Sequence, residues 1–340
     1  MIKPRQFTVL AGVTIVSVLL AAIAYASANR YSQGRVEGQP LSSDLRSRIN
    51  TAAAIEIVQG DKKLTLERSG DQWKLKERAG YPASAEKARA LVLQLSSADM
   101  VEPKTASKDR YSLLELQDPA SKDSKSRGVK VLDDKGKPLA DVVLGKSRPE
   151  AFGSGRAGFY VRKAADNQTW LAVGDPKATA EVKDWVQTGI FSTVSDKITR
   201  LTIAHPGEEP LVIEKGTEKD QKFKLAAMPD GKKLKQGVTI DQVPQGFSSI
   251  DLEDMRKLEA TPAGDKVSVL TLEAEGGLKV TFRLNKDGDA SWLSFTAAGE
   301  GDAKKQADEI NAKATGWEFK IPGWKADTIA KRAADLFETS

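Results

Sequence analysis

The chain contains no cysteine and only one histidine, His205, among its 340 residues. The absence of cysteine excludes disulfide bonds, thiol nucleophiles and cysteine-ligated metal sites. A single histidine cannot form a multi-histidine metal site, and we find no partner nucleophile that would make His205 a general base. The sequence therefore predicts a protein that is not an enzyme and that has no catalytic residues, no cofactor and no bound metal.

A large excess of charge of one sign is also absent. The chain has 52 basic and 47 acidic residues, which leaves a net charge of only +5. Its lysine-bearing loops, such as "EPKTASKDR" and "DPASKDSKSRG", contain acidic residues as well, whereas nucleic-acid-binding proteins gather their cations on one stripe. We therefore expect no nucleic-acid partner. The lack of cysteine also suits an oxidising envelope compartment.

Long apolar runs are missing except at residues 8–28, "TVLAGVTIVSVLLAAIAYASA", which carry no charge. As a helix this run would span about 31 Å, close to the thickness of a bilayer core. Lys3 and Arg5 precede the run and favour a cytoplasmic N-terminus. We therefore predict that residues 1–28 form a single-pass anchor in the inner (cytoplasmic) membrane, with the bulk of the chain in the periplasm.

Cleavage is an alternative to a retained anchor. Ala26, Ser27 and Ala28 form an A-x-A site, so the apolar run could be a signal peptide that is removed after Ala28. The segment that follows, residues 29–43, lacks periodicity and contains glycine and proline, which is typical of a linker.

The remaining sequence predicts two copies of one α+β unit, over residues 44–195 and 196–340. The apolar residues of three period-two segments in the first unit have counterparts in the second: Ile55 and Ile57 with Leu201 and Ile203, Leu64 and Leu66 with Leu211 and Ile213, Trp73 and Leu75 with Phe223 and Leu225. The predicted fold is an N-terminal transmembrane helix followed by two duplicated units of antiparallel sheet with packed helices.

Four helices are expected from apolar spacing and capping residues. The first follows Ser84 as N-cap and places Ala88, Leu91, Val92 and Leu95 on one face. The second covers residues 175–191, with Asp175 as N-cap and Pro176 in the first turn. The third covers residues 248–258, and the fourth ends the chain after a strand within residues 316–337.

Several segments together resemble a known family. The apolar N-terminus, "IEIVQGDKKLTLERSGDQWKL", "GYPASAEKARALVLQL", "VEPKT" and "WLAVGDP" are similar to domain-of-unknown-function family 4340, a family of uncharacterised bacterial envelope proteins. The similarity covers residues 50–258. It implies association with ABC-transporter auxiliary components of the gliding-motility type and implies no catalytic residue.

One glycine motif imitates a dinucleotide site. In "AFGSGRAGFYVRK", Gly153, Gly155 and Gly158 have G-x-G-x-x-G spacing, but that site needs a helix after the glycines, and a strand is expected here. We interpret the glycines as a connection between strands, in which Arg156 is a candidate contact for an anionic ligand.

Aromatic residues make up only 6% of the chain, and four of its six tryptophans occupy periodic positions that predict burial. Trp317 and Trp324 flank "EFKIPG" and are candidates for an exposed contact. We expect a non-catalytic, membrane-anchored periplasmic accessory or scaffold protein whose partner is an ABC-type transporter or another envelope complex. The alternative is a periplasmic module that binds glycan or peptidoglycan.

Overall fold

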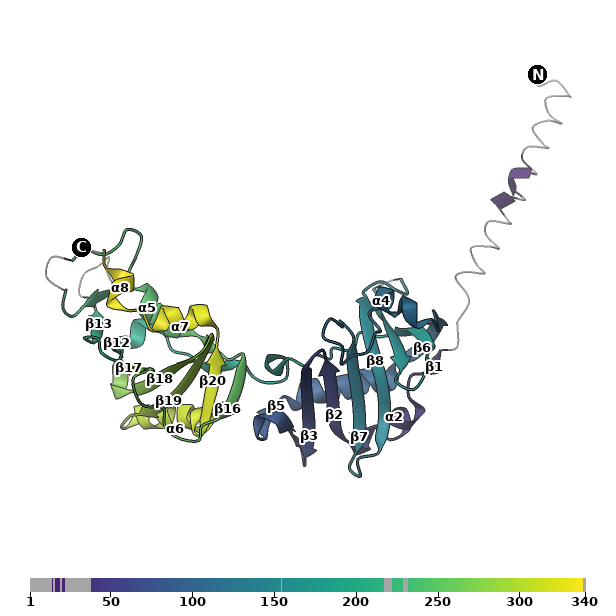
Figure 1. Cartoon of the computed structure of the whole chain (residues 1–340), viewed down its shortest axis with the longest axis horizontal. Coiled ribbons are helices and arrows are strands. Elements are labelled where there is room, and N and C mark those ends of the chain that lie inside the picture. The colour runs from purple at the N-terminus through teal and green to yellow at the C-terminus, as the bar shows by residue number, and fades with distance from the viewer. Residues whose placement is uncertain are drawn as a thin grey trace, which may run out of the picture.

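The computed structural model describes residues 14, 16–18, 20–21, 38–153, 155–216, 222–228 and 232–338. Figure 1 shows two lobes along the long axis of the molecule, each built on one antiparallel sheet. A short two-stranded sheet accompanies the second lobe.

The first lobe contains a ten-stranded sheet of order β1-β6-β10-β9-β8-β7-β2-β3-β4-β5. Its strands are β1 (Gln39–Pro40), β2 (Ala52–Gln59), β3 (Lys62–Ser69), β4 (Gln72–Leu75), β5 (Tyr81–Ala83), β6 (Asp99–Pro103), β7 (Arg127–Asp133), β8 (Pro138–Arg148), β9 (Gly158–Lys163) and β10 (Thr169–Val173). Its helices are α2 (Ser43–Ser47), α3 (Ala85–Ser97) and α4 (Tyr111–Leu114).

The second lobe contains an eight-stranded sheet of order β14-β13-β12-β17-β18-β19-β20-β16. Its strands are β12 (Ile198–Ala204), β13 (Leu211–Lys215), β14 (Phe223–Leu225), β16 (Asp254–Lys257), β17 (Val267–Ala274), β18 (Lys279–Asp287), β19 (Ala290–Ala298) and β20 (Trp317–Ile321). The two-stranded sheet pairs β11 (Gly189–Phe191) with β15 (Ile250–Asp251). The helices are α5 (Gln242–Gln245), α6 (Asp302–Ala314), α7 (Gly323–Ile329) and α8 (Ala333–Leu336).

The two large sheets have the same strand order. Read from one edge, β4-β3-β2-β7-β8-β9-β10-β6 in the first lobe corresponds strand for strand to β14-β13-β12-β17-β18-β19-β20-β16 in the second. The first sheet has β5 and β1 as additional edge strands, and the second has α6 inserted between β19 and β20. Both lobes therefore share one eight-stranded topology with different additional elements.

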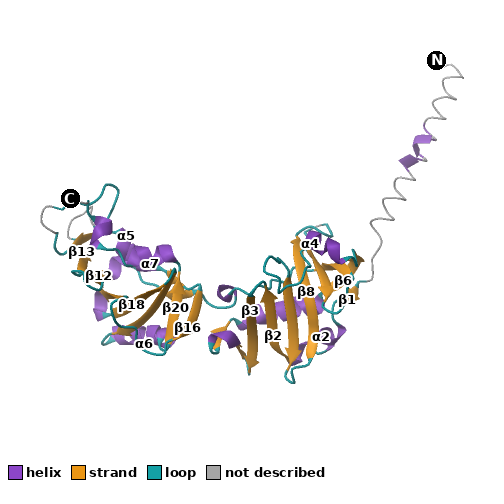
Figure 2. Ribbon diagram, in the orientation of Figure 1, coloured by secondary structure: helices purple, strands orange, loops and turns teal. Residues whose placement is uncertain are grey.

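Alternating burial explains the strands. In β2, Ile55 and Ile57 are fully buried, while the residues between and around them are partly exposed, as expected for a strand with one face on the core. Helix α3 covers this face (Figure 2). It begins as the sequence predicts, because the Ser84 hydroxyl accepts a hydrogen bond from the backbone N–H of Lys87 at 3.3 Å.

The N-terminal part of the predicted fold is wrong. Among the residues that the structure describes, no helix is both long and apolar enough to cross a membrane. Most of residues 8–28 lies outside the described residues.

Two of the predicted helices are also wrong. Residues 175–191 form an extended segment with one short 3-10 turn at Val182–Asp184 and the strand β11. Residues 248–258 form β15 and β16, in which Met255 pairs with Phe319 of β20. In both segments most of the apolar residues are buried, but by packing against distant elements that their helix-like spacing does not reveal.

Candidate functional site

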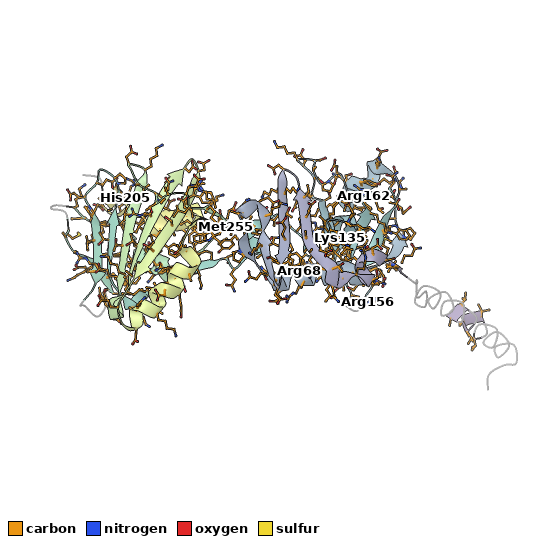
Figure 3. All side chains as sticks on the ribbon, turned by 90° about the horizontal axis from the view of Figure 1, so that it is seen from below. Arg68, Lys135, Arg156, Arg162, His205 and Met255 are labelled. Atoms are coloured by element: carbon orange, nitrogen blue, oxygen red, sulfur yellow. The ribbon has the colours of Figure 1, made fainter. Side chains whose placement is uncertain are left out.

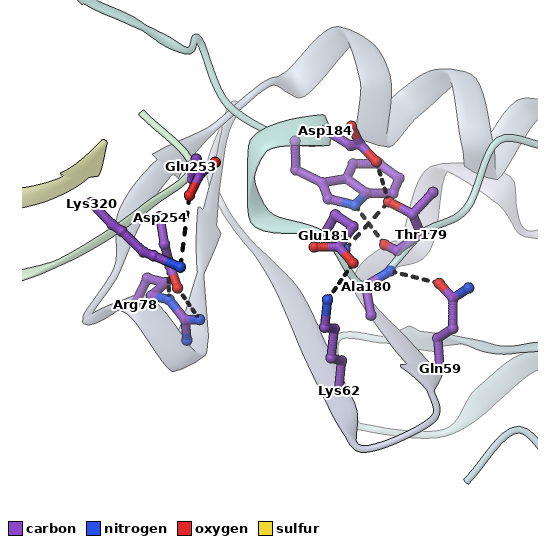
Figure 4. A network of polar contacts seen from close by, with 11 residues as sticks. Gln59, Lys62, Arg78, Thr179, Ala180, Glu181, Asp184, Glu253, Asp254 and Lys320 are labelled. Carbon is purple, nitrogen blue, oxygen red and sulfur yellow. Dashed lines mark hydrogen bonds and ion pairs between the residues drawn. The ribbon is translucent and has the colours of Figure 1, made fainter. Parts of the chain in front are cut away.

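The two lobes are joined by residues 175–191, which we call the strap. Its first part packs on the first lobe. The backbone N–H of Ser84 donates to the Trp185 carbonyl at 2.7 Å, and Lys87 Nζ donates to the Asp184 carbonyl at 2.7 Å. Figure 4 also shows Lys62 of β3 paired with Glu181. The start of α3 and the first residue of β3 therefore fix this part of the strap.

The end of the strap belongs to the second lobe. Strand β11 pairs with β15, and the backbone N–H of Leu252 donates to the Thr188 carbonyl at 2.9 Å. The Phe191 ring meets the Phe282 ring edge to face, with 5.0 Å between centroids. The strap is therefore tied to both lobes, and one continuous cluster holds most of the buried apolar residues of both; a separate, smaller cluster lies in the first lobe.

Direct contacts between the lobes lie beside the strap. Arg78 Nε is 2.6 Å from Asp254 Oδ1 and Arg78 Nη2 is 2.8 Å from Asp254 Oδ2, a bidentate ion pair drawn in Figure 4. These hydrogen bonds raise the pKa of the Arg78 guanidinium above its usual value. The Tyr81 ring meets the Trp317 ring at 4.8 Å and 89°, and burial raises the pKa of the Tyr81 hydroxyl.

A pocket of about 370 Å³ opens at this junction. We call it the junction pocket, and its lining includes Tyr81, Ser84, Gln187, Ile190, Lys313 and Trp317. The residues come from the first lobe, the strap and the second lobe, so the pocket exists only while the lobes are docked. Its lining offers a cation, neutral polar groups and two aromatic rings, a set that suits binding of a polar ligand or a partner side chain.

Four residues considered as site candidates in the sequence, Arg156, His205, Trp317 and Trp324, lie in different surroundings in the structure. Trp317 is half-buried in the junction pocket, where Lys257 Nζ lies 3.9 Å from its ring centroid. Trp324 on α7 is 66% exposed. Figure 3 shows Arg156 in the first lobe and His205 in the second. His205 is buried, with Nδ1 2.8 Å from Ser268 Oγ and Nε2 3.2 Å from the Lys331 carbonyl.

The glycine motif lies in the connection between β8 and β9. Gly153 and Gly155 have φ of 68° and 73°, and Gly158 begins β9 rather than a helix. A Cβ atom at Gly158 would lie 2.7 Å from the Ala151 Cβ, so close packing explains this glycine. The strand, turn and helix of a dinucleotide site are not formed here. Arg156 is exposed on the same connection.

The described residues contain no group of three or more histidine, cysteine, aspartate or glutamate side chains arranged to hold a metal ion. Comparison with known sequences does identify a family. The sequence profile described as "Domain of unknown function (DUF4340)" matches residues 73–275, more than half of the chain. The chain belongs to the DUF4340 family. No curated protein and no solved structure matches it.

The matched region of this DUF4340 protein runs from β4 to the end of β17 and thus includes the strap and both residues of the Arg78–Asp254 ion pair, but not Lys313 or Trp317. Sequence reasoning did not find the ion pair at this junction. Arg78 and Asp254 are 176 positions apart, and nothing in a single sequence distinguishes such a pair from other exposed charges. Trp317 is the only one of the three contact candidates, beside Arg156 and Trp324, that lines the junction pocket.

Proposed function

We propose that this protein is a non-catalytic accessory or scaffold protein that holds two similar lobes in one orientation, so that both contact the same complex in the cell envelope. The observation that carries the proposal is the junction, where the strap, the Arg78–Asp254 ion pair and the Tyr81–Trp317 contact fix the lobes together. A rigid arrangement lowers the entropy lost when a partner contacts both lobes at once. An ABC-type transporter is the partner that the family resemblance implies.

The test is site-specific photocrosslinking of the full chain in cells, followed by identification of the captured proteins. Crosslinkers at exposed positions of both lobes are expected to capture the same envelope complex. Loosening the junction with Arg78→Ala and Tyr81→Ala together is expected to weaken capture while each sheet stays folded. Lys286→Ala is the matched control, because it breaks an exposed ion pair with Asp327 of α7 that lies within the second lobe.

Glycan binding is the second candidate function, and the exposure of Trp324 favours it. An exposed indole offers a flat apolar face on which a sugar ring can stack. Trp317 is less suited, since Tyr81 and Lys257 both contact its ring, whereas the Trp324 ring has Lys325 Nζ over one face, at 4.9 Å from its centroid. Sedimentation with purified peptidoglycan distinguishes the two functions. Saturable binding of peptidoglycan by the wild type that is lost in the Trp324→Ala variant would support glycan recognition. Crosslinking of the Trp324→Ala variant to a protein complex at the level of the wild type would support the scaffold.

A further inference from the structure

A second pocket, of about 350 Å³, adjoins the junction pocket, and the two share Gly189, Ile190 and Lys313 as lining residues. Gln306 and Glu309 of α6 line the second pocket and lie on the same helix face as Lys313. We call the two pockets together the strap groove, because β11 of the strap forms one wall and α6 forms the other. From residue 306 to residue 313 the helix rises about 10 Å, the length of about three extended residues, and the junction pocket continues the groove from there.

The wall formed by β11 is the edge of a strand. Among the described strands β11 pairs with β15 alone, so its other edge has no neighbouring strand. Gly189, Ile190 and Phe191 all line the second pocket, although successive side chains of a strand point to opposite faces. A pocket that touches consecutive residues of a strand faces its edge, where the main-chain N–H and C=O groups lie.

Gly189 presents its main-chain polar groups at this edge. The backbone N–H of Leu252 donates to the Thr188 carbonyl at 2.9 Å, beside the pairing of Gly189 with Asp251. This flanking bond identifies Gly189 and Asp251 as a non-hydrogen-bonded pair of the antiparallel ladder, so the N–H and C=O of Gly189 point away from β15. Gly189 is exposed and has no side chain, so it lines both pockets with main-chain atoms.

Lys313 is the only charged residue that lines the junction pocket. Its side chain is exposed, and its ammonium group forms no ion pair among the described residues. Glu309, one turn earlier on α6, lines only the second pocket and is not paired with Lys313. The rings of Tyr81 and Trp317 lie at the same end of the groove as Lys313. This end therefore suits an acidic group next to an apolar one.

We propose that an extended segment of a partner protein binds in the strap groove as a strand added to β11. Its main chain exchanges hydrogen bonds with Gly189, an acidic side chain pairs with Lys313, and an apolar side chain lies against Tyr81 and Trp317. The edge strand β5 is a poor template for the same segment, because Pro82 has no N–H to donate. The inference rests on the proposed function, because it identifies where the envelope partner contacts the chain.

The test selects binders of the full chain from a displayed library of random peptides of about ten residues, long enough to span the groove. The library is first depleted on Ala312→Trp, which places a ring in the junction pocket without changing a polar group. A retained peptide is then synthesised and is expected to combine Asp or Glu with β-branched and aromatic residues. When it binds, the amide hydrogen of Gly189 is expected to exchange more slowly, because the added strand accepts its hydrogen bond.

Two pairs of variants locate the bound peptide. Lys313→Ala is expected to weaken binding by about twofold to fivefold, the range of an exposed ion pair, while Lys305→Ala on the same helix leaves it unchanged. Gly189→Pro removes the N–H donor and is expected to weaken binding by about fivefold or more. Gly189→Ala keeps the donor, and its Cβ would lie 3.9 Å from Asp251 Oδ1, so binding equal to wild type is expected.

Three results would overturn the proposal: no peptide retained by the wild type after depletion, equal binding by both Lys313→Ala and Gly189→Pro, or unchanged exchange of the Gly189 amide. Photocrosslinking in cells separates this proposal from the scaffold function. Capture of the envelope complex by Ala312→Trp at the level of the wild type would contradict binding in the groove and leave the scaffold intact. Absence of capture by the wild type would contradict the scaffold itself.

Discussion

Alanine substitution of Arg78 and Asp254, singly and together, measures how strongly the two lobes are coupled. The two side chains form a bidentate pair and are 29% and 27% exposed, so the pair is neither a free surface ion pair nor a fully buried one. Exposed pairs contribute about 0.2–1 kcal/mol, and breaking a buried pair costs about 3–5 kcal/mol. The intermediate exposure leads us to expect a coupling energy of about 1–2 kcal/mol in the double-mutant cycle.

The assay is urea unfolding of the full-length wild type, both single variants and the double variant. Asp254 Oδ1 also accepts the backbone N–H of Met255 at 2.8 Å, so Asp254→Ala is expected to cost more than Arg78→Ala. Small-angle X-ray scattering is expected to show a wider distribution of lobe separations in every variant that breaks the pair. The coupling between Arg78 and Asp254 would be refuted if the stability losses of the two single variants sum to that of the double variant within about 0.3 kcal/mol and the scattering is unchanged.

Three further predictions concern the first lobe. Gly145→Ala is expected to lower the free energy of unfolding by about 2 kcal/mol or more, because the new Cβ atom would lie 2.2 Å from the Leu114 carbonyl oxygen. Gly323 has open space around its Cα, so Gly323→Ala is the neutral control in the same denaturation assay. Ser84→Ala is expected to lower the free energy of unfolding by about 1 kcal/mol, because the α3 cap is lost. Amide hydrogens in the first turn of α3 are then expected to exchange faster, and exchange as slow as in the wild type would contradict the capping role. Asp133 accepts a hydrogen bond from the backbone N–H of Lys137 at 2.8 Å, and this bond lowers the pKa of the Asp133 carboxyl below the usual 3.8. The carboxylate therefore stabilises the fold above pH 3.8, and this stabilisation is lost as the pH falls through the lower folded-state pKa. Asp133→Asn is therefore expected to flatten the acid limb of the stability profile, and an unchanged limb would contradict this.

Much of the first lobe could be predicted because its signals are local. The alternation of Ile55 and Ile57 identifies a half-buried strand, and Ser84 before an apolar stripe marks the start of α3. Helix α6 gave no such signal, because its buried face consists of small residues, Ala303, Ala307 and Ala314. In a hydrophobicity pattern, a buried helix face made of alanines looks like the exposed face of a helix, so it does not mark a buried helix.

The strap shows why burial alone does not determine local structure. Val182, Trp185, Val186 and Ile190 have helical spacing and are all buried, yet the backbone around them is mostly extended. The Trp185 indole donates to the Thr179 carbonyl at 2.8 Å, and its own carbonyl accepts from Ser84. These tertiary hydrogen bonds replace the ones that a helix would make. The junction depends on such contacts between distant segments. The Arg78–Asp254 ion pair and the extended course of the strap therefore could not be found from one sequence, although Trp317 was identified there as a contact candidate.

The most direct test of the proposed function is photocrosslinking from both lobes in the same cells, with the Arg78→Ala and Tyr81→Ala double variant beside the Lys286→Ala control. We predict that crosslinkers in the two lobes capture subunits of one envelope complex and that the junction variant loses capture from at least one lobe. Capture of no protein partner, or capture that the junction variant leaves unchanged, would contradict a scaffold that works by holding its lobes together.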